Sequence, residues 1–427
     1  MERFQKQKII QIAKKAKEAS LNIASLSTDV KNNILKALAE NLLKNKDFIL
    51  NENYKDVELA KKMKLSNAFV DRLTLNETRL NNMSKSILSL INLPDPVGKI
   101  INSWQAPSGF FISKIRVPIG VILIIYEARP DVTSDCIGLC IKSGNAVILK
   151  GGSESLNSNL AIYKVFLNIL KKFSFPCDAI NVIPTRDRRV LNLLLRLNDY
   201  IDLVIPRGGE NLIKKVTSIS RIPVIKHYKG ICHIYVDKDA DIEMARKVCF
   251  NAKVQRPSTC NAMESMLVHR DIAEKYLPLI LKDLVEAGVE IRGCSYTLKI
   301  AKNLGLNKAK FRKATIKDYQ TEYLDLILAV KVVNDLEEAI DHINRYGSHH
   351  SDAIITFKEN TAEEFLKRID SACVYHNAST RLTDGYQFGM GAEIGISTDR
   401  IHARGPMALE ELTTYKYIIK GKGHIRT

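Results

Sequence analysis

The chain has 427 residues, of which 45% are hydrophobic, and it carries 64 Lys and Arg against 47 Asp and Glu, a formal net charge of +17. No segment is of low complexity, so this length and composition predict a soluble globular protein of two or more domains. The longest apolar run, near 119–126, is far too short to span a bilayer. The N-terminus has no signal-type apolar core, so we expect a cytoplasmic protein with no membrane contact.

The positive charge raises nucleic-acid binding as one alternative. The basic residues are spread along the whole chain, however, and one Trp offers no platform on which bases would stack. Attraction of small anionic substrates explains the charge at least as well. We therefore expect no nucleic acid, and keep a basic nucleic-acid-binding protein as the rival class.

Residues 1–90 are predicted to be helical, and the Pro-containing segment 93–99 ends this region. An extended stretch follows at 110–117. From there, β-branched runs alternate with amphipathic helices, which predicts a doubly wound parallel sheet that binds its ligand at the carboxyl ends of its strands. The predicted strands are 117–126, 146–149, 180–183, 201–205 and 222–225, and the predicted helices are 132–142, 154–173, 187–197 and 210–219.

A second α/β unit is predicted from residue 231 onwards. The tail from Thr413 is basic and prone to form a strand. Beside the extended segment 110–117 it can pair with another subunit, or it can be an edge strand within one subunit, and the residues leave both readings open. The predicted strands of this unit are 231–236, 266–268, 326–333, 353–357 and 373–376, and the predicted helices are 241–252, 271–287, 335–346 and 360–369.

Two glycine pairs lie where a predicted strand meets a predicted helix. No G-x-G-x-x-G and no Walker A sequence is present. Glycine allows close backbone approach and helix N-termini attract phosphate, so two such junctions in one sheet predict a dinucleotide site. A turn that needs only a flexible backbone is the plainer explanation of each pair alone. The predicted cofactor-binding residues are Lys150, Gly151, Gly152 and Ser153 at one junction and Gly208, Gly209 and Glu210 at the other.

The stretch 254–262, which contains Cys260, reads as a turn that opens a helix, with Ser258 or Thr259 as N-cap and Glu264 in the first turns. Backbone N–H groups at a helix N-terminus favour the thiolate, which is the nucleophilic form. The alternative is a small buried residue packed as a hydrophobe. Cysteine spacing shows no C-x-x-C pair, so neither a disulfide framework nor a metal site is expected.

Several long motifs together resemble one known family, that of glutamate-5-semialdehyde dehydrogenase (γ-glutamyl phosphate reductase), within the aldehyde dehydrogenase superfamily. The resemblance covers nearly the whole chain. It implies an aldehyde-dehydrogenase-like α/β fold and the NADPH-dependent reduction of L-glutamyl 5-phosphate to L-glutamate 5-semialdehyde, the second step of proline biosynthesis. The motifs are EARPDVT at 127–133, SGNAVILKGG at 143–152, IPRGGENLI at 205–213, ICHIYVD at 231–237, NAKVQRPSTCN at 251–261, HSDAIIT at 350–356, VYHNASTRLTDGYQFGMGAEIGIST at 374–398 and HARGPMALEELTTYK at 402–416.

The resemblance also implies roles for individual residues. Cys260 is the nucleophile that forms a thioester, and Arg129, Arg381 and Asn261 contact the substrate. Hydrolytic aldehyde dehydrogenases carry a Glu in an E-L-G-G-type segment, and the comparable stretch at 229–233 lacks it. The residue after Arg129-Pro130 is Asn in many relatives and Asp131 here, so Asp131 is not expected to donate to an oxyanion. His227 and His233 are not expected to act as catalytic bases.

For domain organisation, the resemblance implies an NADP(H)-binding domain at 1–109 and 122–229 and a catalytic domain at 230–403. An oligomerisation element is expected at 110–121 and 404–427. The family further implies a homo-oligomer, with glutamate 5-kinase as a partner. The rival enzyme is another acylating aldehyde dehydrogenase that uses coenzyme A in place of phosphate.

Overall fold

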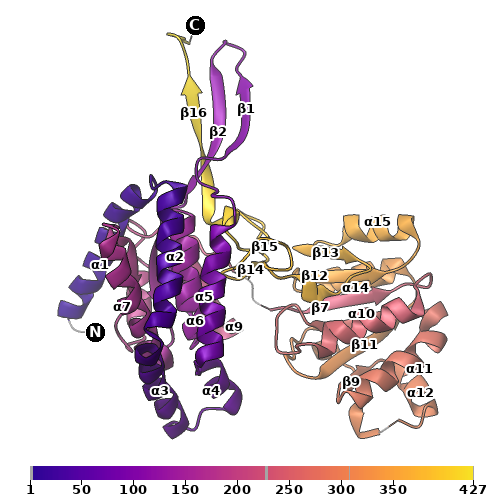
Figure 1. Ribbon diagram of the computed structural model, residues 1–427. Coiled ribbons are helices and arrows are strands. Elements are labelled where there is room, and N and C mark those ends of the chain that lie inside the picture. The colour runs from indigo at the N-terminus through magenta and orange to yellow at the C-terminus, as the bar shows by residue number, and fades with distance from the viewer. Residues whose placement is uncertain (1–2, 227–228, 307, 427) are drawn as a thin grey trace. The chain divides into compact units, whose positions relative to one another are not determined.

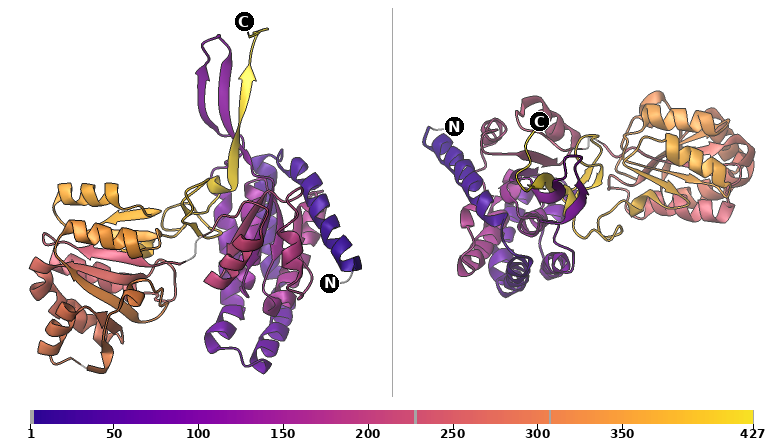
Figure 2. Two further views of the ribbon diagram at one scale, coloured as in Figure 1. Left: turned by 180° about the vertical axis from the view of Figure 1, so that it is seen from behind. Right: turned by 90° about the horizontal axis from the view of Figure 1, so that it is seen from above.

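The computed structural model describes residues 3–226, 229–306 and 308–426. The chain divides into two compact units. The first unit comprises Met1–Lys226, Gly389–Gly395 and Met407–Thr427, and the second comprises His227–Phe388 and Ile396–Pro406. Helix α1 (Arg3–Ile23) and strand β16 (Thr413–Lys420), the outermost elements of the sequence, thus both belong to the first unit (Figure 2).

The first unit is built around a parallel sheet whose described strands run in the order β5-β4-β3-β6. Every residue of β3 and β4 is buried, as expected for central strands of a sheet covered on both faces. The strands are β3 (Val121–Tyr126), β4 (Ala146–Lys150), β5 (Ile180–Val182) and β6 (Leu203–Arg207). The further helices are α2 (Thr28–Lys44), α3 (Lys46–Lys62), α4 (Asn67–Leu73), α5 (Glu77–Ile91), α6 (Pro130–Lys142), α7 (Leu156–Lys172), α8 (Val190–Leu194) and α9 (Glu210–Ile219).

The predicted alternation of strands and helices is confirmed for this unit, with two differences. The predicted strand 117–126 is divided, because Gly120 has a φ of 128° and separates β3 from the preceding strand. The predicted strand at 222–225 is reduced to a single parallel bridge between Val204 and Val224. Neither difference moves the carboxyl ends of β3, β4 and β6, which lie at one edge of the sheet.

A separate antiparallel sheet belongs to the same unit and extends away from its helices (Figure 1). Its described strands run in the order β1-β2-β16, with β1 at Ile100–Gln105 and β2 at Phe111–Pro118. The tail strand β16 pairs with β2 over its whole length, from Thr413 opposite Pro118 to Lys420 opposite Phe111. Of the two predicted pairings of the tail, the one within a single chain is therefore present.

The second unit contains a longer parallel sheet, whose described strands run in the order β10-β9-β11-β8-β7-β12-β13. Its main core packs β7, β8 and β11 against α10 and α11. Sequence analysis missed β9, β10, α12 and the short α13. The strands are β7 (Cys232–Val236), β8 (Met263–His269), β9 (Glu290–Gly293), β10 (Phe311–Lys313), β11 (Ile327–Val333), β12 (Ser351–Ile355) and β13 (Cys373–His376). The helices are α10 (Ile242–Val254), α11 (Arg270–Glu286), α12 (Ser295–Asn303), α13 (Ile316–Tyr319), α14 (Leu336–Tyr346) and α15 (Glu359–Arg368).

Across the described residues, no helix combines the length and the apolar character that crossing a membrane requires.

Candidate active site

Cys260 lies in the turn that joins the end of α10 to the start of β8, and its side chain is partly exposed. The prediction that this turn opens a helix is wrong. Met263 begins a fully buried strand that pairs with β7 on one side and β11 on the other, so Glu264 lies in β8. Ser258 and Thr259 therefore cap no helix, and no helix dipole stabilises a thiolate at Cys260.

A positive side chain, Arg381, lies near the turn instead. Arg381 lies in the short 3-10 helix Thr380–Leu382, and its Nε donates to Gln255 Oε1 at 2.9 Å, on the residue that ends α10. Burial and the neighbouring Arg256 lower the pKa of Arg381, whereas Asp384 and the Cys260 sulfur act in the opposite direction. The predicted anion-binding residue Arg381 thus lies within the electrostatic reach of Cys260, and an opposite charge nearby favours the thiolate.

Asn261 fixes the turn to the segment that carries Arg381. Its Nδ2 donates to Thr383 O at 2.8 Å, and its carbonyl oxygen accepts from Thr380 Oγ1 at 2.8 Å. Its Oδ1 accepts from Thr259 Oγ1 at 2.9 Å and from Arg381 Nη1. The side chain of Asn261, which was predicted to contact the substrate, thus bonds to protein through both its Nδ2 and its Oδ1. Its bond to Arg381 orients the arginine.

Two residues that sequence analysis did not single out press against the backbone of Cys260. A Cβ on Gly230 would lie 1.8 Å from Cys260 O and 2.7 Å from Cys260 Cα, so only glycine fits here. Cys232 Sγ donates to Cys260 O at 3.2 Å, and burial raises the pKa of Cys232 well above its usual value. Cys232 is thus a neutral hydrogen-bond donor. The glycine in the stretch 229–233 was the sequence signal for this contact.

In the first unit, the loop Gly151-Gly152 packs directly against the end of β3. A Cβ on Gly151 would lie 2.3 Å from Asn159 Nδ2, and one on Gly152 would lie 2.9 Å from Ala128 N. The N-terminus of the following helix α7 is occupied, because buried Asp56 accepts from Ser158 N at 2.8 Å and from Ser158 Oγ at 2.7 Å. A phosphate at the N-terminus of α7, which the sequence suggested, would meet the Asp56 carboxylate at Ser158.

Lys150 and Ser153 lie beside this loop with a carboxylate between them. Lys150 Nζ donates to Gly151 O at 2.8 Å, and Ser153 Oγ donates to Glu154 Oε1 at 2.7 Å. Burial lowers the pKa of Lys150, and Glu154 partly offsets this. The loop thus presents a cation, a hydroxyl and a carboxylate close together, which suits a ribose with its attached groups.

The second glycine pair holds an oxygen anion at the N-terminus of α9. Gly209 N donates to Glu127 Oε1 at 2.9 Å, and a Cβ on Gly208 would lie 2.8 Å from the same oxygen. A carboxylate from the β3 end thus sits where a helix N-terminus attracts negative charge. Glu210 pairs with Lys214 at 2.7 Å one turn later, a surface ion pair. Glu127 was not predicted to take part.

Arg129 begins α6 next to a second arginine that sequence analysis did not assign. Arg207 ends β6 opposite Tyr126, and its Nη1 donates to Glu393 O at 3.0 Å. Burial and the charge of Arg207 lower the pKa of Arg129. Within the described part of the chain, the Arg129 side chain has no hydrogen bond or ion pair, so its charge remains available to an anion. No group of three or more His, Cys, Asp or Glu among those residues is placed to hold a metal.

Comparison with known proteins identifies the class to which this fold and site belong. The model described as "Aldehyde dehydrogenase family" matches residues 1–290, and the chain belongs to that family. An engineered glycolyl-CoA reductase with bound NADP⁺ shares the fold at 16% identity, with a TM-score of 0.67 and 96% of each chain covered.

Within that family, the chain belongs with the gamma-glutamyl phosphate reductases. A relative of that name from Thermodesulfovibrio yellowstonii is 53% identical over 421 residues, which cover 99% of each chain. The crystal structure of gamma-glutamyl phosphate reductase from Thermotoga maritima is 46% identical, covers 98% of this chain and 100% of that one, and has a TM-score of 0.94. The predicted family and fold class are confirmed.

Proposed function

We propose that this chain catalyses the NADPH-dependent reduction of L-glutamyl 5-phosphate to L-glutamate 5-semialdehyde with release of phosphate, the second step of proline biosynthesis. The observation that carries the proposal is the near-complete coverage of relatives that bear this name, at about half identity. The geometry supports it, because a partly exposed cysteine lies within reach of the charge of Arg381.

In the first step, the Cys260 thiolate attacks the acyl carbon of the substrate. The bond from that carbon to the phosphate oxygen breaks, inorganic phosphate leaves with the electron pair, and a thioester remains on Cys260. Backbone N–H groups of the turn stabilise the oxyanion that forms on the way. Arg381 and Arg129 are the proposed contacts for the anionic groups of the substrate, and Asn261 holds the turn against Arg381.

The proposed cofactor site lies in the first unit, at the two loops already described. The start of α9 already holds the Glu127 carboxylate on Gly209 N, so a pyrophosphate held by Gly208, Gly209 and Glu210 would take the place of that carboxylate. Lys150 and Ser153, with the glycines between them, suit the ribose and its 2′-phosphate. When bound, NADPH supplies the hydride that reduces the thioester to the aldehyde level, after which Cys260 is released as the thiol.

Protection of the thioester from water is part of the proposal. The stretch 229–233, Lys-Gly-Ile-Cys-His, carries no carboxylate that would activate water. Its glycine is in contact with the Cys260 backbone, and its cysteine is a neutral donor. His233 is fully buried, with Nδ1 3.1 Å from Asp352 Oδ1, and His227 lies outside the described residues. A thioester at Cys260 would therefore meet hydride and not hydroxide.

The assay that tests the function runs the reaction backwards. With glutamate 5-semialdehyde, NADP⁺ and phosphate, we expect NADPH absorbance to rise, and to rise only when phosphate is present, because phosphate must resolve the thioester. Coenzyme A is the control nucleophile and should have no effect. Oxidation without phosphate, or oxidation that needs coenzyme A, would contradict the proposal and favour the acylating rival.

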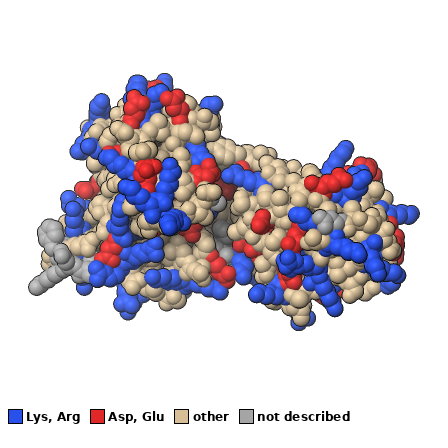
Figure 3. All heavy atoms as spheres, turned by 90° about the horizontal axis from the view of Figure 1, so that it is seen from below, with Lys and Arg blue, Asp and Glu red and all other residues tan. Residues whose placement is uncertain are grey.

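The nucleic-acid-binding rival gains no support from the one face of the molecule drawn in Figure 3. On the face shown in Figure 3, Lys and Arg side chains are spread widely and Asp and Glu side chains lie among them. A protein that binds nucleic acid through its backbone concentrates positive charge on one face. We therefore interpret the net charge as attraction of an anionic substrate and cofactor. The cytoplasmic location and a glutamate 5-kinase partner stay predictions.

The sheet β1-β2-β16 is the proposed oligomerisation element. One face carries Trp104, Tyr417 and Ile419, with exposures of 39%, 50% and 59%, and the Trp104 and Tyr417 ring centroids are 6.1 Å apart. The register places these residues on one face, because Trp104 pairs with Ile112 and Ile112 with Ile419. An apolar stripe of this kind on a protruding sheet suits a second copy of the chain.

We expect Tyr417→Lys with Ile419→Lys to dissociate the oligomer, because two charges would be buried at the interface. Sedimentation velocity measures the change. The matched control is Lys416→Ala with Lys420→Ala, which removes charges of the same strand and should keep the wild-type sedimentation coefficient. An unchanged coefficient for the double lysine variant would show that this face is not the interface.

A further inference from the structure

A buried ion pair joins the two elements that flank the Cys260 turn. Lys253 lies in the last turn of α10 and Glu264 is the second residue of β8, so the turn that carries Cys260 is enclosed between them. Lys253 Nζ lies 2.7 Å from Glu264 Oε2, and the two side chains are 0% and 1% exposed. This ion pair therefore links the two ends of the turn, at the end of α10 and the start of β8.

The second carboxylate oxygen of Glu264 links the turn to another segment of the chain. Leu324 N donates to Glu264 Oε1 at 3.0 Å, and Glu322, two residues earlier, accepts from Gly230 N at 2.9 Å. Gly230 in turn presses on the backbone of Cys260. The contacts form a ring that runs from Lys253 through Glu264 and the 322–324 segment to Gly230 and back to the turn.

Stability alone does not explain why the chain keeps charges at this place. Burial raises the pKa of Glu264 to about 7, against the effect of Lys253, and burial also lowers the pKa of Lys253. Both ions thus lose hydration, and a buried ion pair is often no more stable than an apolar pair of similar volume. What an apolar pair cannot supply is a directional bond that fixes the distance between α10 and β8.

We propose that Lys253 and Glu264 are positioning residues, which hold the Cys260 turn in the geometry that keeps the thiol beside Arg381. They touch neither substrate nor cofactor in this proposal. It rests on the proposed role of Cys260 and goes beyond it, because it assigns the control of thiol reactivity to a pair of side chains buried beneath the turn.

Three variants separate positioning from stability. In Lys253→Met, a carboxyl group remains buried without its cation, so we expect a lower melting temperature. We also expect about a tenfold fall in kcat of the reverse reaction with an unchanged KM for NADP⁺. In Lys253→Met with Glu264→Leu, no buried charge remains, so the melting temperature should return towards the wild-type value while kcat stays low. The single variant Glu264→Leu completes the double-mutant cycle of Lys253 and Glu264.

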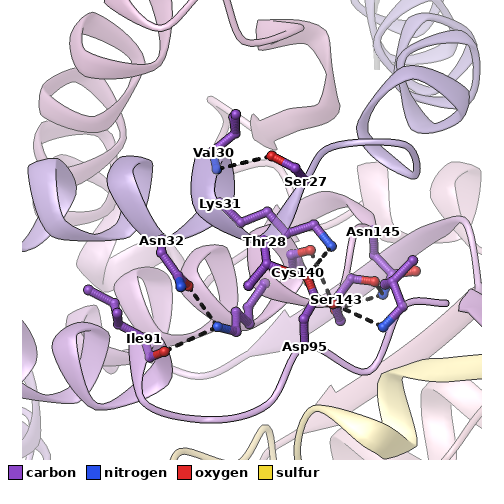
Figure 4. Close-up of polar contacts among 12 residues, drawn as sticks. Ser27, Thr28, Val30, Lys31, Asn32, Ile91, Asp95, Cys140, Ser143 and Asn145 are labelled. Carbon is purple, nitrogen blue, oxygen red and sulfur yellow. Dashed lines mark hydrogen bonds and ion pairs between the residues drawn. The ribbon is translucent and has the colours of Figure 1, made fainter. Parts of the chain in front are cut away.

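The matched control is a buried ion pair of the same kind in the first unit. Lys31 Nζ lies 2.9 Å from Asp95 Oδ2, with exposures of 0% and 8% (Figure 4). Asp95 Oδ1 accepts from Val97 N at 2.9 Å. Like Glu264, Asp95 thus binds a lysine and a backbone N–H, and it also accepts from Thr28 Oγ1 at 3.1 Å. Lys31→Met should lower the melting temperature in the same way and leave kcat unchanged.

Alkylation of Cys260 by iodoacetamide, followed at that residue by peptide mass spectrometry, gives a readout that does not depend on the reaction. We expect it to slow about tenfold at neutral pH in the double variant, because a thiol moved away from Arg381 ionises less. If the double variant recovers both kcat and alkylation, or if Lys31→Met loses them equally, the positioning role is wrong. A wild-type protein that fails the phosphate assay would instead contradict the proposed function.

Discussion

Replacing Cys260 with serine should lower turnover by about 10⁴-fold or more, because a serine hydroxyl is a far weaker nucleophile than a thiolate. Cys260 depends on the ionisation of its own thiol, which the nearby charge of Arg381 favours. A hydroxyl does not ionise at neutral pH under the same charge. The measurement is NADPH formation from the semialdehyde, NADP⁺ and phosphate with the purified variant.

Cofactor binding should survive this substitution, because the proposed NADPH site belongs to the first unit and Cys260 to the second. Fluorescence titration with NADPH is therefore the folding control. Cys294→Ser is the matched cysteine control, since Cys294 is also partly exposed in the second unit and its Sγ lies 3.3 Å from Thr297 Oγ1. That variant should keep full turnover. Activity retained in Cys260→Ser would rule out a thioester intermediate on this residue.

Replacing Gly230 with alanine should lower turnover by at least about 10²-fold, because the added methyl group would lie 1.8 Å from Cys260 O. Carbon and oxygen atoms that are not bonded need well over about 3 Å, so either the turn or the strand that follows Gly230 must move by more than about 1 Å. Overpacking of this kind also destabilises, here by about 3 kcal/mol. Turnover and the melting temperature measure the two effects separately.

Gly421→Ala provides the comparison for this prediction. Its added methyl group would meet the His424 side chain first, at 3.1 Å, in the exposed tail, where the ring can move aside. Turnover and melting temperature should both stay at the wild-type values. If Gly230→Ala behaves like Gly421→Ala, the close packing on Cys260 has no functional role.

Much of the candidate site could be predicted from residues that lie near one another in the sequence. The two glycine pairs and Arg129 follow the carboxyl ends of predicted strands, where side chains of an α/β fold meet their ligands, and the turn with Cys260 follows the end of a predicted helix. The structure places each at such an end. Arg207 was equally readable, since it ends β6 directly before a glycine pair, but its charge was not assigned a role.

The wrong prediction that Cys260 precedes a helix has a physical cause. The residues from Ala262 onwards are apolar enough for a helix or for a buried strand, and short apolar runs do not distinguish the two. Pairing with β7 and β11 selected the strand, and those partners lie far away in the sequence. The positive charge near Cys260 therefore comes from an arginine side chain, and not from the helix dipole that the sequence predicted.

No local sequence pattern could predict the contacts that hold the Cys260 turn. Glu264 binds the backbone of Leu324, 60 residues away, and Gly230 binds Glu322, 92 residues away. Likewise, only the tertiary contact with Asp56 shows that the N-terminus of α7 is already occupied, while that of α9 accepts Glu127. Such contacts depend on how distant segments pack, which hydrophobic periodicity does not encode.

By itself, the sequence determined the family, the α/β class, the order of most elements and the cysteine to examine, because these depend on local periodicity and on long motifs. The tertiary structure alone decided that Cys260 precedes a strand, that Arg381 lies within its electrostatic reach, and that Gly230, Cys232 and a buried Lys253–Glu264 pair lie around its turn. The physical reason is that reactivity depends on charges and close contacts within a few ångströms, and folding brings these together from segments far apart in the chain.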